Sequence, residues 1–293
     1  MTDTPQSTRL DPRLNPYRAD LAANHLRGEV DAPKFAPGKD FQIIAPVTPL
    51  TKGPSDPAPI ETQLLFGEVF RVYDEGAGWA WGQAARDDYV GYVARSALTP
   101  APVLHTHTVA ALRTFVYSQP DIKRRPLMSL SMNARVAVTA ARGVFSQLSN
   151  SGWIFTDHLA STEEKEKDFV AVAERFIGVP YLWGGRESLG LDCSALVQTA
   201  LERAGFHALR DTDMQEATLG EPLPAPFDLT SLQRGDLIFW KGHVGIMQDG
   251  ERLLHANATH MCTASEPFLE AVARIAKSDG DITSIRRLPS LGA

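Results

Sequence analysis

The strongest constraint on this fold is a change in the spacing of apolar residues near residue 160. Between about residues 38 and 160 the apolar residues form short runs, such as FQIIAPV and QLLFGEVFRVYDE, which Gly, Pro and Asp interrupt. Short runs bounded by turn residues are typical of small all-β barrels. After residue 160 the apolar residues recur at helical spacing. We therefore expect β structure first and a unit containing helices afterwards.

A loose internal repeat divides the β region into two parts. The run GYVARSALTP near residues 91–100 has a counterpart in GWIFTDHLA near 152–160, and the upstream runs also correspond. A repeat at this period favours two tandem barrels of roughly 60 residues each. The predicted organisation is an N-terminal extension over 1–37, a first β-barrel over 38–100, a second β-barrel over 101–160 and a last domain over 161–293.

The last domain is predicted to have an α+β fold. Ser161 and Glu164 match a capping box, which predicts the start of a helix, and Gly178 and Pro180 would stop it. A second helix is expected from Cys193 to Ala204. The runs DLIFW, HVGIM and RLLHANA then predict three strands. Helices followed by an antiparallel meander describe an α+β domain.

Composition excludes several classes of function. The 293 residues carry a formal net charge of −6, which gives no electrostatic reason to expect nucleic acid as a partner. No apolar run is long enough to span a membrane, and the first residues lack the apolar core of a secretory signal. We therefore expect a cytoplasmic protein without a membrane partner. In a reducing compartment its two cysteines, Cys193 and Cys262, are expected to be free thiols.

Cys193 stands where a glycine-rich loop becomes a helical pattern, in the stretch LGLDCSALV. A lone cysteine beside apolar residues is by default a packed core thiol. Here Asp192 can cap the helix, which puts Cys193 in the first turn, where unpaired backbone N–H groups face the sulfur. Because a free thiol is mostly protonated at neutral pH, a nucleophilic role also requires a histidine partner.

Two histidines on adjacent predicted strands are candidates for that partner: His243 in HVGIM and His255 in RLLHANA. A two-residue loop at Asp249-Gly250 would put their rings on opposite faces of the sheet. A three-residue loop over Gln248–Gly250 would instead place His243 directly opposite His255. We predict the second arrangement, in which His243 takes the proton of Cys193 and His255 orients His243.

Two other roles for these histidines are compatible with the sequence. Each histidine alone could be a polar strand residue. A metal site built from His243, His255, His260 and Cys262 is conceivable, but the sequence lacks the close paired-ligand spacing of a zinc site. We therefore expect no metal and no organic cofactor.

Several separated motifs resemble a known family. The runs PYLWGGRESLGLDCSALVQTALERAG, LRDTDMQ, LQRGDLIFWKGHVGIM and LLHANA resemble, in content, order and spacing, the NlpC family of papain-like bacterial cell-wall peptidases. The resemblance covers about residues 163–285. One departure is Ala195, where the family usually has glycine; the change is small in volume. The resemblance implies a papain-like catalytic domain.

The resemblance also implies roles for individual residues. Cys193 corresponds to the nucleophile, His243 to the base and His255 to the third catalytic residue. Tyr181 corresponds to the tyrosine whose hydroxyl helps the Cys193 backbone N–H form the oxyanion hole. Further positions match those that line the substrate groove of the family: Trp183, Asp192, Ser194, Asp211 and Thr212. Thr212 stands where relatives usually have serine, and it keeps the hydroxyl.

The predicted barrels resemble bacterial Src-homology-three-like domains. Together with the expected absence of a signal sequence, these barrels narrow the resemblance to one subgroup, the γ-D-glutamyl-L-diamino acid endopeptidases. These are the dipeptidyl-peptidase VI-like enzymes, which act on small murein peptides. In those enzymes the first barrel blocks one end of the groove and recognises a free N-terminal L-Ala. An amine needs a carboxylate partner, and Glu61 with Tyr89 are the candidates here. The implied partner is a murein-derived peptide, L-Ala-γ-D-Glu-diamino acid, in cell-wall peptide recycling or degradation.

Two alternative functions are compatible with the same motifs. One is an amidase or acyltransferase of the same fold that acts on another substrate. The other is a non-catalytic protein that binds wall peptides. The presence of Cys193, His243 and His255 together favours a catalytic protein over a binding protein.

Overall fold

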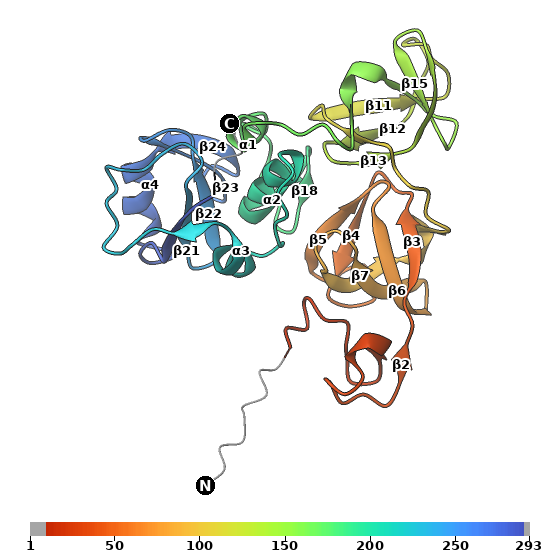
Figure 1. Ribbon diagram of the computed structural model, residues 1–293, viewed down its shortest axis with the longest axis horizontal. Helices are drawn as coiled ribbons and strands as arrows, with labels where there is room; N and C mark the ends of the chain where they lie inside the picture. Colours follow the sequence, from red (N-terminus) through yellow and green to blue (C-terminus); the bar gives the residue numbers. More distant parts are fainter. Residues whose placement is uncertain (1–9, 290–293) are drawn as a thin grey trace.

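The computed structural model describes residues 10–289 and shows two β units stacked beside a unit that contains the helices (Figure 1). The order predicted from the sequence, with β structure first and mixed structure afterwards, is confirmed. Residues 10–36 form β1 (Ala22–Ala23), the 3₁₀ helix η1 (Asn24–Leu26) and β2 (Phe35–Ala36). The first nine residues of the predicted extension lie outside the described residues.

The described part of the extension is packed against the first β unit. Leu21, Ala23 and Leu26 share a small apolar cluster with Tyr73 and Trp81 of that unit. Burial of these side chains stabilises the contact through the hydrophobic effect. The described part of the extension therefore belongs structurally to the first β unit.

The first β unit is a seven-stranded antiparallel sheet in the order β5-β4-β8-β7-β6-β3-β9. Its core contains side chains from most of these strands, including Phe41, Ile43, Leu50, Leu64 and Phe70. The elements are β3 (Lys39–Ile43), β4 (Val47–Thr51), β5 (Ile60–Leu65), β6 (Val69–Gly76), β7 (Trp79–Ala84), β8 (Val90–Ala94), η2 (Arg95–Ala97) and β9 (Leu98–Pro100).

The second β unit contains a five-stranded sheet, β12-β11-β16-β15-β14, and a three-stranded sheet, β13-β10-β17. Its elements are β10 (His107–Val109), β11 (Arg113–Tyr117), β12 (Pro126–Ser131), β13 (Arg135–Val136), β14 (Val138–Arg142), β15 (Phe145–Leu148), β16 (Trp153–Phe155), η3 (Thr156–His158) and β17 (Leu159–Ser161). Both β units end in a strand, a 3₁₀ turn and a strand, in β8-η2-β9 and β16-η3-β17. These are the two segments that the sequence repeat matched.

The third unit has a six-stranded sheet, β20-β25-β21-β22-β23-β24, with helices on both faces. The predicted meander is confirmed as β21-β22-β23, whereas β24, β25 and α4 were not predicted. The elements are α1 (Phe169–Glu174), β18 (Arg186–Glu187), β19 (Gly190–Leu191), α2 (Cys193–Arg203), α3 (Thr212–Thr218), β20 (Glu221–Pro222), β21 (Leu237–Trp240), β22 (His243–Met247), β23 (Arg252–Asn257), β24 (Cys262–Pro267), α4 (Phe268–Ile275) and β25 (Ser284–Arg287).

The two faces of this sheet have separate cores. Phe239, Val244 and Leu254 pack on one face with α1 and α2. Trp240 and Leu253 pack on the other face with α4. The alternation follows from the two-residue period of a strand.

The predicted start of the first helix is wrong. Glu164 does accept a hydrogen bond from the Ser161 N–H at 2.7 Å, but Ser161 belongs to β17 and α1 begins at Phe169. Asp168 is the true N-cap, since its carboxylate accepts from the backbone N–H groups of Val170 and Ala171. The residues TEEKEK after Ser161 offer no apolar side chain that could bury a helical turn, and a short helix depends on such packing. The second predicted helix, in contrast, begins at Cys193 as expected.

The predicted register between β22 and β23 is wrong by two residues. Met247 pairs with Leu253, and the three-residue loop is Asp249–Glu251, because the Gln248 N–H donates to the Arg252 carbonyl. The Asp249 carboxylate accepts from the Glu251 and Arg252 N–H groups at 2.8 Å each, which closes the turn from its own side chain. A shift of two residues keeps each side chain on its face of the sheet, so His243 and His255 still lie on the same face.

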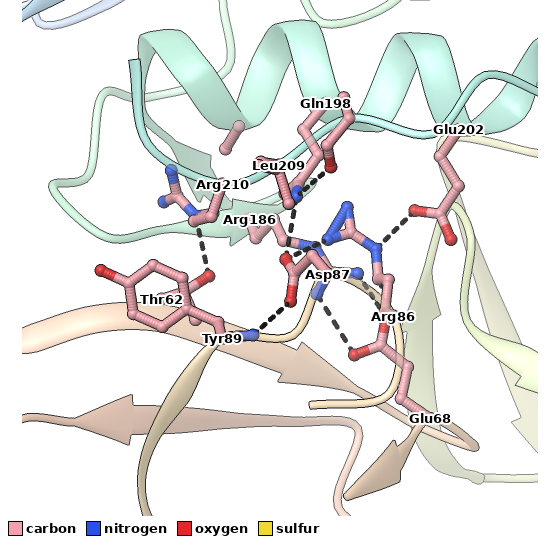
Figure 2. Close-up of polar contacts among 12 residues, drawn as sticks. Thr62, Glu68, Arg86, Asp87, Tyr89, Arg186, Gln198, Glu202, Leu209 and Arg210 are labelled. Atoms are coloured by element: carbon pink, nitrogen blue, oxygen red, sulfur yellow. Dashed lines mark hydrogen bonds and ion pairs between the residues drawn. The ribbon is translucent and has the colours of Figure 1, made fainter. Parts of the chain in front are cut away.

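A buried ionic network joins the first β unit to the third unit (Figure 2). Arg186 of β18 donates to the Glu68 carboxylate and to the Gln63 carbonyl of the β unit. Arg86 of the β unit donates to Glu202 of α2 at 2.8 Å. Buried charges are tolerated only when paired, so these contacts specify how the two units are oriented.

Candidate active site

Cys193 is the first residue of α2, and its sulfur lies against the start of β22. The Asp192 carboxylate caps the helix by accepting from the Ala195 N–H at 2.9 Å. The Thr212 hydroxyl lies 4.0 Å from the sulfur. The Val244 backbone N–H donates to the same sulfur. The nucleophile candidate is therefore held at a helix N-terminus, beside the strand that begins with His243.

Asp192 is held by an arginine that sequence reasoning missed. Arg210 donates to both oxygens of Asp192, at 3.0 and 2.7 Å, and the Gly184 N–H donates to one of them at 2.9 Å. Arg210 also donates from Nε to the Thr62 hydroxyl of the first β unit at 2.8 Å (Figure 2). Asp192 thus lines the groove, but its oxygens are used to fix the helix start. Ser194 belongs to the same cluster, since its hydroxyl accepts from Arg210.

His243 and His255 form the predicted pair. Nε2 of His243 lies 2.8 Å from Nδ1 of His255, and the ring centroids are 5.0 Å apart. Because Nε2 of His243 is used in this contact, Nδ1 is the nitrogen left to take a proton. The His243 ring also packs at 5.8 Å from the buried ring of Trp240. His255 is completely buried, which suits an orienting group.

A carboxylate and a guanidinium continue this chain of contacts. Nε2 of His255 lies 2.6 Å from Oε1 of Glu266, which in turn accepts from Arg274. Sequence reasoning missed Glu266 and Arg274, because β24 and α4 were not predicted. An apolar stripe after Pro267, in the run FLEAVARI, was the available signal for α4.

Burial shifts the titrating groups of the site toward their neutral forms. Burial and the Asp192 charge raise the pKa of Cys193 to about 11, against hydrogen bonds from Val244 and Thr212. Burial and the charges of His255 and Arg274 lower the pKa of His243 to about 3. A neutral thiol and a neutral imidazole are the protonation states that direct proton transfer during attack on a substrate requires.

Tyr181 lies in the same cavity as the sulfur. Burial raises its pKa, and the Cys193 charge raises it further, so its hydroxyl keeps the proton. A protonated hydroxyl beside the nucleophile can donate to an oxyanion.

The cavity in front of Cys193 has a volume of about 320 Å³. All the predicted site residues line it except His243 and His255. The remaining lining residues, which were not predicted, are Arg13, Arg210, Asp213 and Gly242. The exposed ring of Trp183 stands at the cavity wall.

One end of the cavity carries converging carboxylates. The Tyr89 hydroxyl lies 3.0 Å from Asp211 Oδ2 and 3.4 Å from Glu61 Oε2. Arg13 donates to the same Asp211 oxygen at 2.8 Å and to Asp213 at 3.0 Å. Two carboxylates around one hydroxyl can hold a cationic amine. This end is built by the first β unit, α3 and the N-terminal segment together.

The metal interpretation gains no support. Within residues 10–289 no three His, Cys, Asp or Glu side chains are grouped so that they could hold a metal ion. Both Cys193 and Cys262 are free thiols. In the same range of residues, none of the helices combines the length and apolar character that crossing a bilayer requires.

Comparison with known proteins places these features among peptidases. A family model described as NlpC/P60 family matches residues 178–273, and one described as Bacterial dipeptidyl-peptidase Sh3 domain matches residues 50–98. A Bacillus subtilis protein named γ-D-glutamyl-L-lysine dipeptidyl-peptidase is 30% identical over 223 residues, covering 68% of this chain and 73% of the relative.

Two further comparisons extend over most of the chain. Dipeptidyl-peptidase 6 of Lysinibacillus sphaericus is 25% identical, covering 73% of this chain and 86% of the relative. The crystal structure of an NlpC/P60 family protein from Bacillus cereus has a TM-score of 0.70 at 19% identity, covering 85% of this chain and all of that one. The fold is therefore shared across the β structure and the third unit.

Proposed function

Because the chain belongs to the NlpC/P60 family and is a cysteine peptidase, we propose that it cleaves peptides that begin L-Ala-γ-D-Glu. The scissile bond joins γ-D-Glu to a diamino acid, and the peptide derives from murein. The names of the two relatives, a γ-D-glutamyl-L-lysine dipeptidyl-peptidase and a dipeptidyl-peptidase 6, support this substrate class.

The observation that carries the proposal is the distribution of groups along one cavity. Cys193 lies in its wall, and Glu61 with Asp211 converge on Tyr89 in another part of the same wall. A free N-terminal amine is a cation, and desolvating it requires carboxylate partners. Such an arrangement favours peptides with a free amine at a short distance from the scissile carbonyl.

The proposed reaction proceeds through a thioester. The Cys193 sulfur attacks the γ-carbonyl carbon while its proton moves to Nδ1 of His243. Tyr181 and the Cys193 backbone N–H donate to the oxyanion. The carbon–nitrogen bond then breaks as His243 returns the proton to the departing amine. Water then attacks the thioester carbon as His243 takes its proton. The carbon–sulfur bond breaks, the proton passes from His243 to the Cys193 sulfur, and the L-Ala-γ-D-Glu dipeptide is released.

We also propose roles for the remaining parts of the chain. The second β unit is proposed to be a second Src-homology-three-like barrel, since it repeats the strand–3₁₀–strand ending of the first. The proposed domain boundaries remain 38–100, 101–160 and 161–293. A cytoplasmic role in murein peptide recycling fits a peptidase for short, soluble peptides.

Hydrolysis of defined tripeptides tests the proposal. L-Ala-γ-D-Glu-L-Lys and L-Ala-γ-D-Glu-diaminopimelate are incubated with the wild-type protein and with Cys193→Ser, and products are followed by mass spectrometry. We expect L-Ala-γ-D-Glu from the wild type alone. Intact tripeptides after long incubation would contradict the proposal.

Two control measurements separate the alternatives. N-acetylated tripeptide should be cleaved far more slowly, because its amine carries no charge; equal cleavage would favour an amidase or acyltransferase of the same fold. Although burial keeps the Cys193 thiol neutral, iodoacetamide should label it faster than the half-buried Cys262, because His243 can take the Cys193 proton during the attack. Equal labelling would favour the non-catalytic binding protein.

A further inference from the structure

We propose that Glu266, held by Arg274, is a positioning residue that fixes the tautomers of both active-site histidines. The inference rests on the proposed function, in which His243 takes the Cys193 proton. It adds to the three catalytic positions a carboxylate that does not line the cavity in front of Cys193.

The tautomers follow from donor and acceptor counting along the chain of contacts. A carboxylate can only accept, so Nε2 of His255 must carry a hydrogen toward Glu266 at 2.6 Å. A neutral imidazole has one N–H, so Nδ1 of His255 is an acceptor. Nδ1 of His255 must then accept a hydrogen bond from the N–H at Nε2 of His243, and these two nitrogens are 2.8 Å apart. Nδ1 of His243 is left with its lone pair, which is the form required of a base.

The fold leaves a place for this carboxylate. In the register of β23 and β24, Ala264 lies opposite His255, while Glu266 lies opposite Leu253, one pair further along the same face. The small alanine leaves room for Glu266 to lean diagonally toward the buried ring. Arg274, on α4, donates to the same carboxylate oxygen that His255 contacts. The site is therefore assembled by β23, β24 and α4 together.

The negative charge has a function that a neutral amide could not supply. When Cys193 loses its proton, a buried imidazolium forms, and a carboxylate at the end of the chain stabilises it. Burial would raise the pKa of Glu266, but the hydrogen bond from His255 and the charge of Arg274 lower it. Glu266 therefore stays ionised. The charged or titrating groups that face it are His243, His255, His260 and Arg274.

The test compares Glu266→Gln with Glu270→Gln, a matched change at an exposed carboxylate on α4. The first readout is the rate of Cys193 alkylation by iodoacetamide between pH 5 and 10, which needs no peptide. The amide of a glutamine can donate as well as accept, so in Glu266→Gln the tautomer is no longer fixed and the imidazolium loses its counter-charge. We expect alkylation of Glu266→Gln at pH 7 to fall about tenfold or more, and its pH profile to move to higher pH.

Peptide kinetics supply the second readout. For Glu266→Gln we expect kcat to fall about 10- to 100-fold with little change in KM, because the substrate does not contact Glu266. Glu266→Asp should recover part of the loss, since it restores the charge. A purely structural role would lower the melting temperature and move neither the alkylation profile nor the ratio of kcat to KM.

The outcomes separate this inference from the proposed function. A folded Glu266→Gln protein with wild-type alkylation and kcat would overturn the positioning role, even if the tripeptide is the true substrate. A shifted alkylation profile, combined with no tripeptide cleavage by the wild type, would support the positioning role and reject the substrate. A shift of equal size in Glu270→Gln would also overturn the inference.

Discussion

Arg13 donates to the carboxylate of Asp211 at 2.8 Å, although 198 residues separate them in the chain. The N-terminal segment reaches this position because the Val90 N–H donates to the Arg13 carbonyl and Gln83 donates to the Leu14 carbonyl, each at 2.8 Å. The first β unit therefore carries the segment to the groove. One side of the proposed amine site is therefore formed by Arg13, a residue near the amino terminus.

Removal of Arg13 should weaken substrate binding at acidic pH. Burial raises the pKa of Asp211, and Arg13 is one of the groups that oppose this shift. In Arg13→Ala the pKa of Asp211 should rise further, so the carboxylate that binds the amine is neutralised at a higher pH. We expect KM to rise roughly two- to fivefold near pH 5.5, with a smaller change at pH 8. Steady-state kinetics across pH measure this.

The control for that prediction is Arg27→Ala, an exposed arginine of the same segment that stacks on Phe35. Its KM should follow the wild type at both pH values. An Arg13→Ala profile that is parallel to the wild type would argue that Asp211 does not bind the amine.

Tyr181→Phe should lower kcat while leaving KM almost unchanged. The phenol hydroxyl is the proposed donor to the oxyanion, which exists only during reaction. Loss of one such donor typically costs about 100-fold or more in kcat. Stopped-flow or steady-state kinetics with the tripeptide measure the effect. An unchanged kcat would remove Tyr181 from the oxyanion hole.

Arg210→Met should destabilise the protein, because it leaves the Asp192 charge buried without its partner. Breaking one side of a buried ion pair costs about 3–5 kcal/mol. The double variant Arg210→Met with Asp192→Asn should recover part of this free energy of unfolding, measured by urea denaturation. Additive losses in the double variant would show that the two side chains are not coupled.

Glu202 should contribute to resistance against acid. Burial would raise its pKa, but Arg86, Arg186 and Arg135 lower it to about 2, from an ordinary value of 4.5. A lowered pKa stabilises the fold above pH 4.5, and this contribution is lost as the pH falls toward 2. The wild type should therefore lose on the order of 2–3 kcal/mol through this group over that window.

The comparison with Glu202→Gln isolates this contribution. The variant should be less stable than the wild type at pH 7, and the difference should shrink as the pH falls from 4.5 toward 2. Urea unfolding at several pH values measures it, with Glu163→Gln, an exposed site, as the control. A stability difference that is constant with pH would contradict the electrostatic role of Glu202.

The register of β22 and β23 shows why a wrong detail left the main prediction intact. The sequence predicted the loop between these strands one residue too early. Nothing in Gln248–Glu251 indicates in advance that the Asp249 carboxylate accepts two backbone N–H groups. The resulting shift of two residues equals one full strand period, so each histidine kept its face. The contact of His243 with His255 was therefore predictable, whereas the residue directly opposite each was not.

The sequence by itself determined the local features of this protein. These are the order of β and mixed structure, the helix that begins at Cys193, and the shared face of the two histidines. Each depends on capping chemistry or on the period of a strand, which neighbouring residues set.

Only the tertiary structure decided what surrounds those features. It brought Glu266 and Arg274 behind His255, Arg210 onto Asp192, and Arg13 into the groove. These contacts join side chains whose distances depend on packing between elements and units, and no local period encodes that packing. A buried charge does predict that some partner exists, because it must be paired, but only the folded chain specifies which residue supplies the partner.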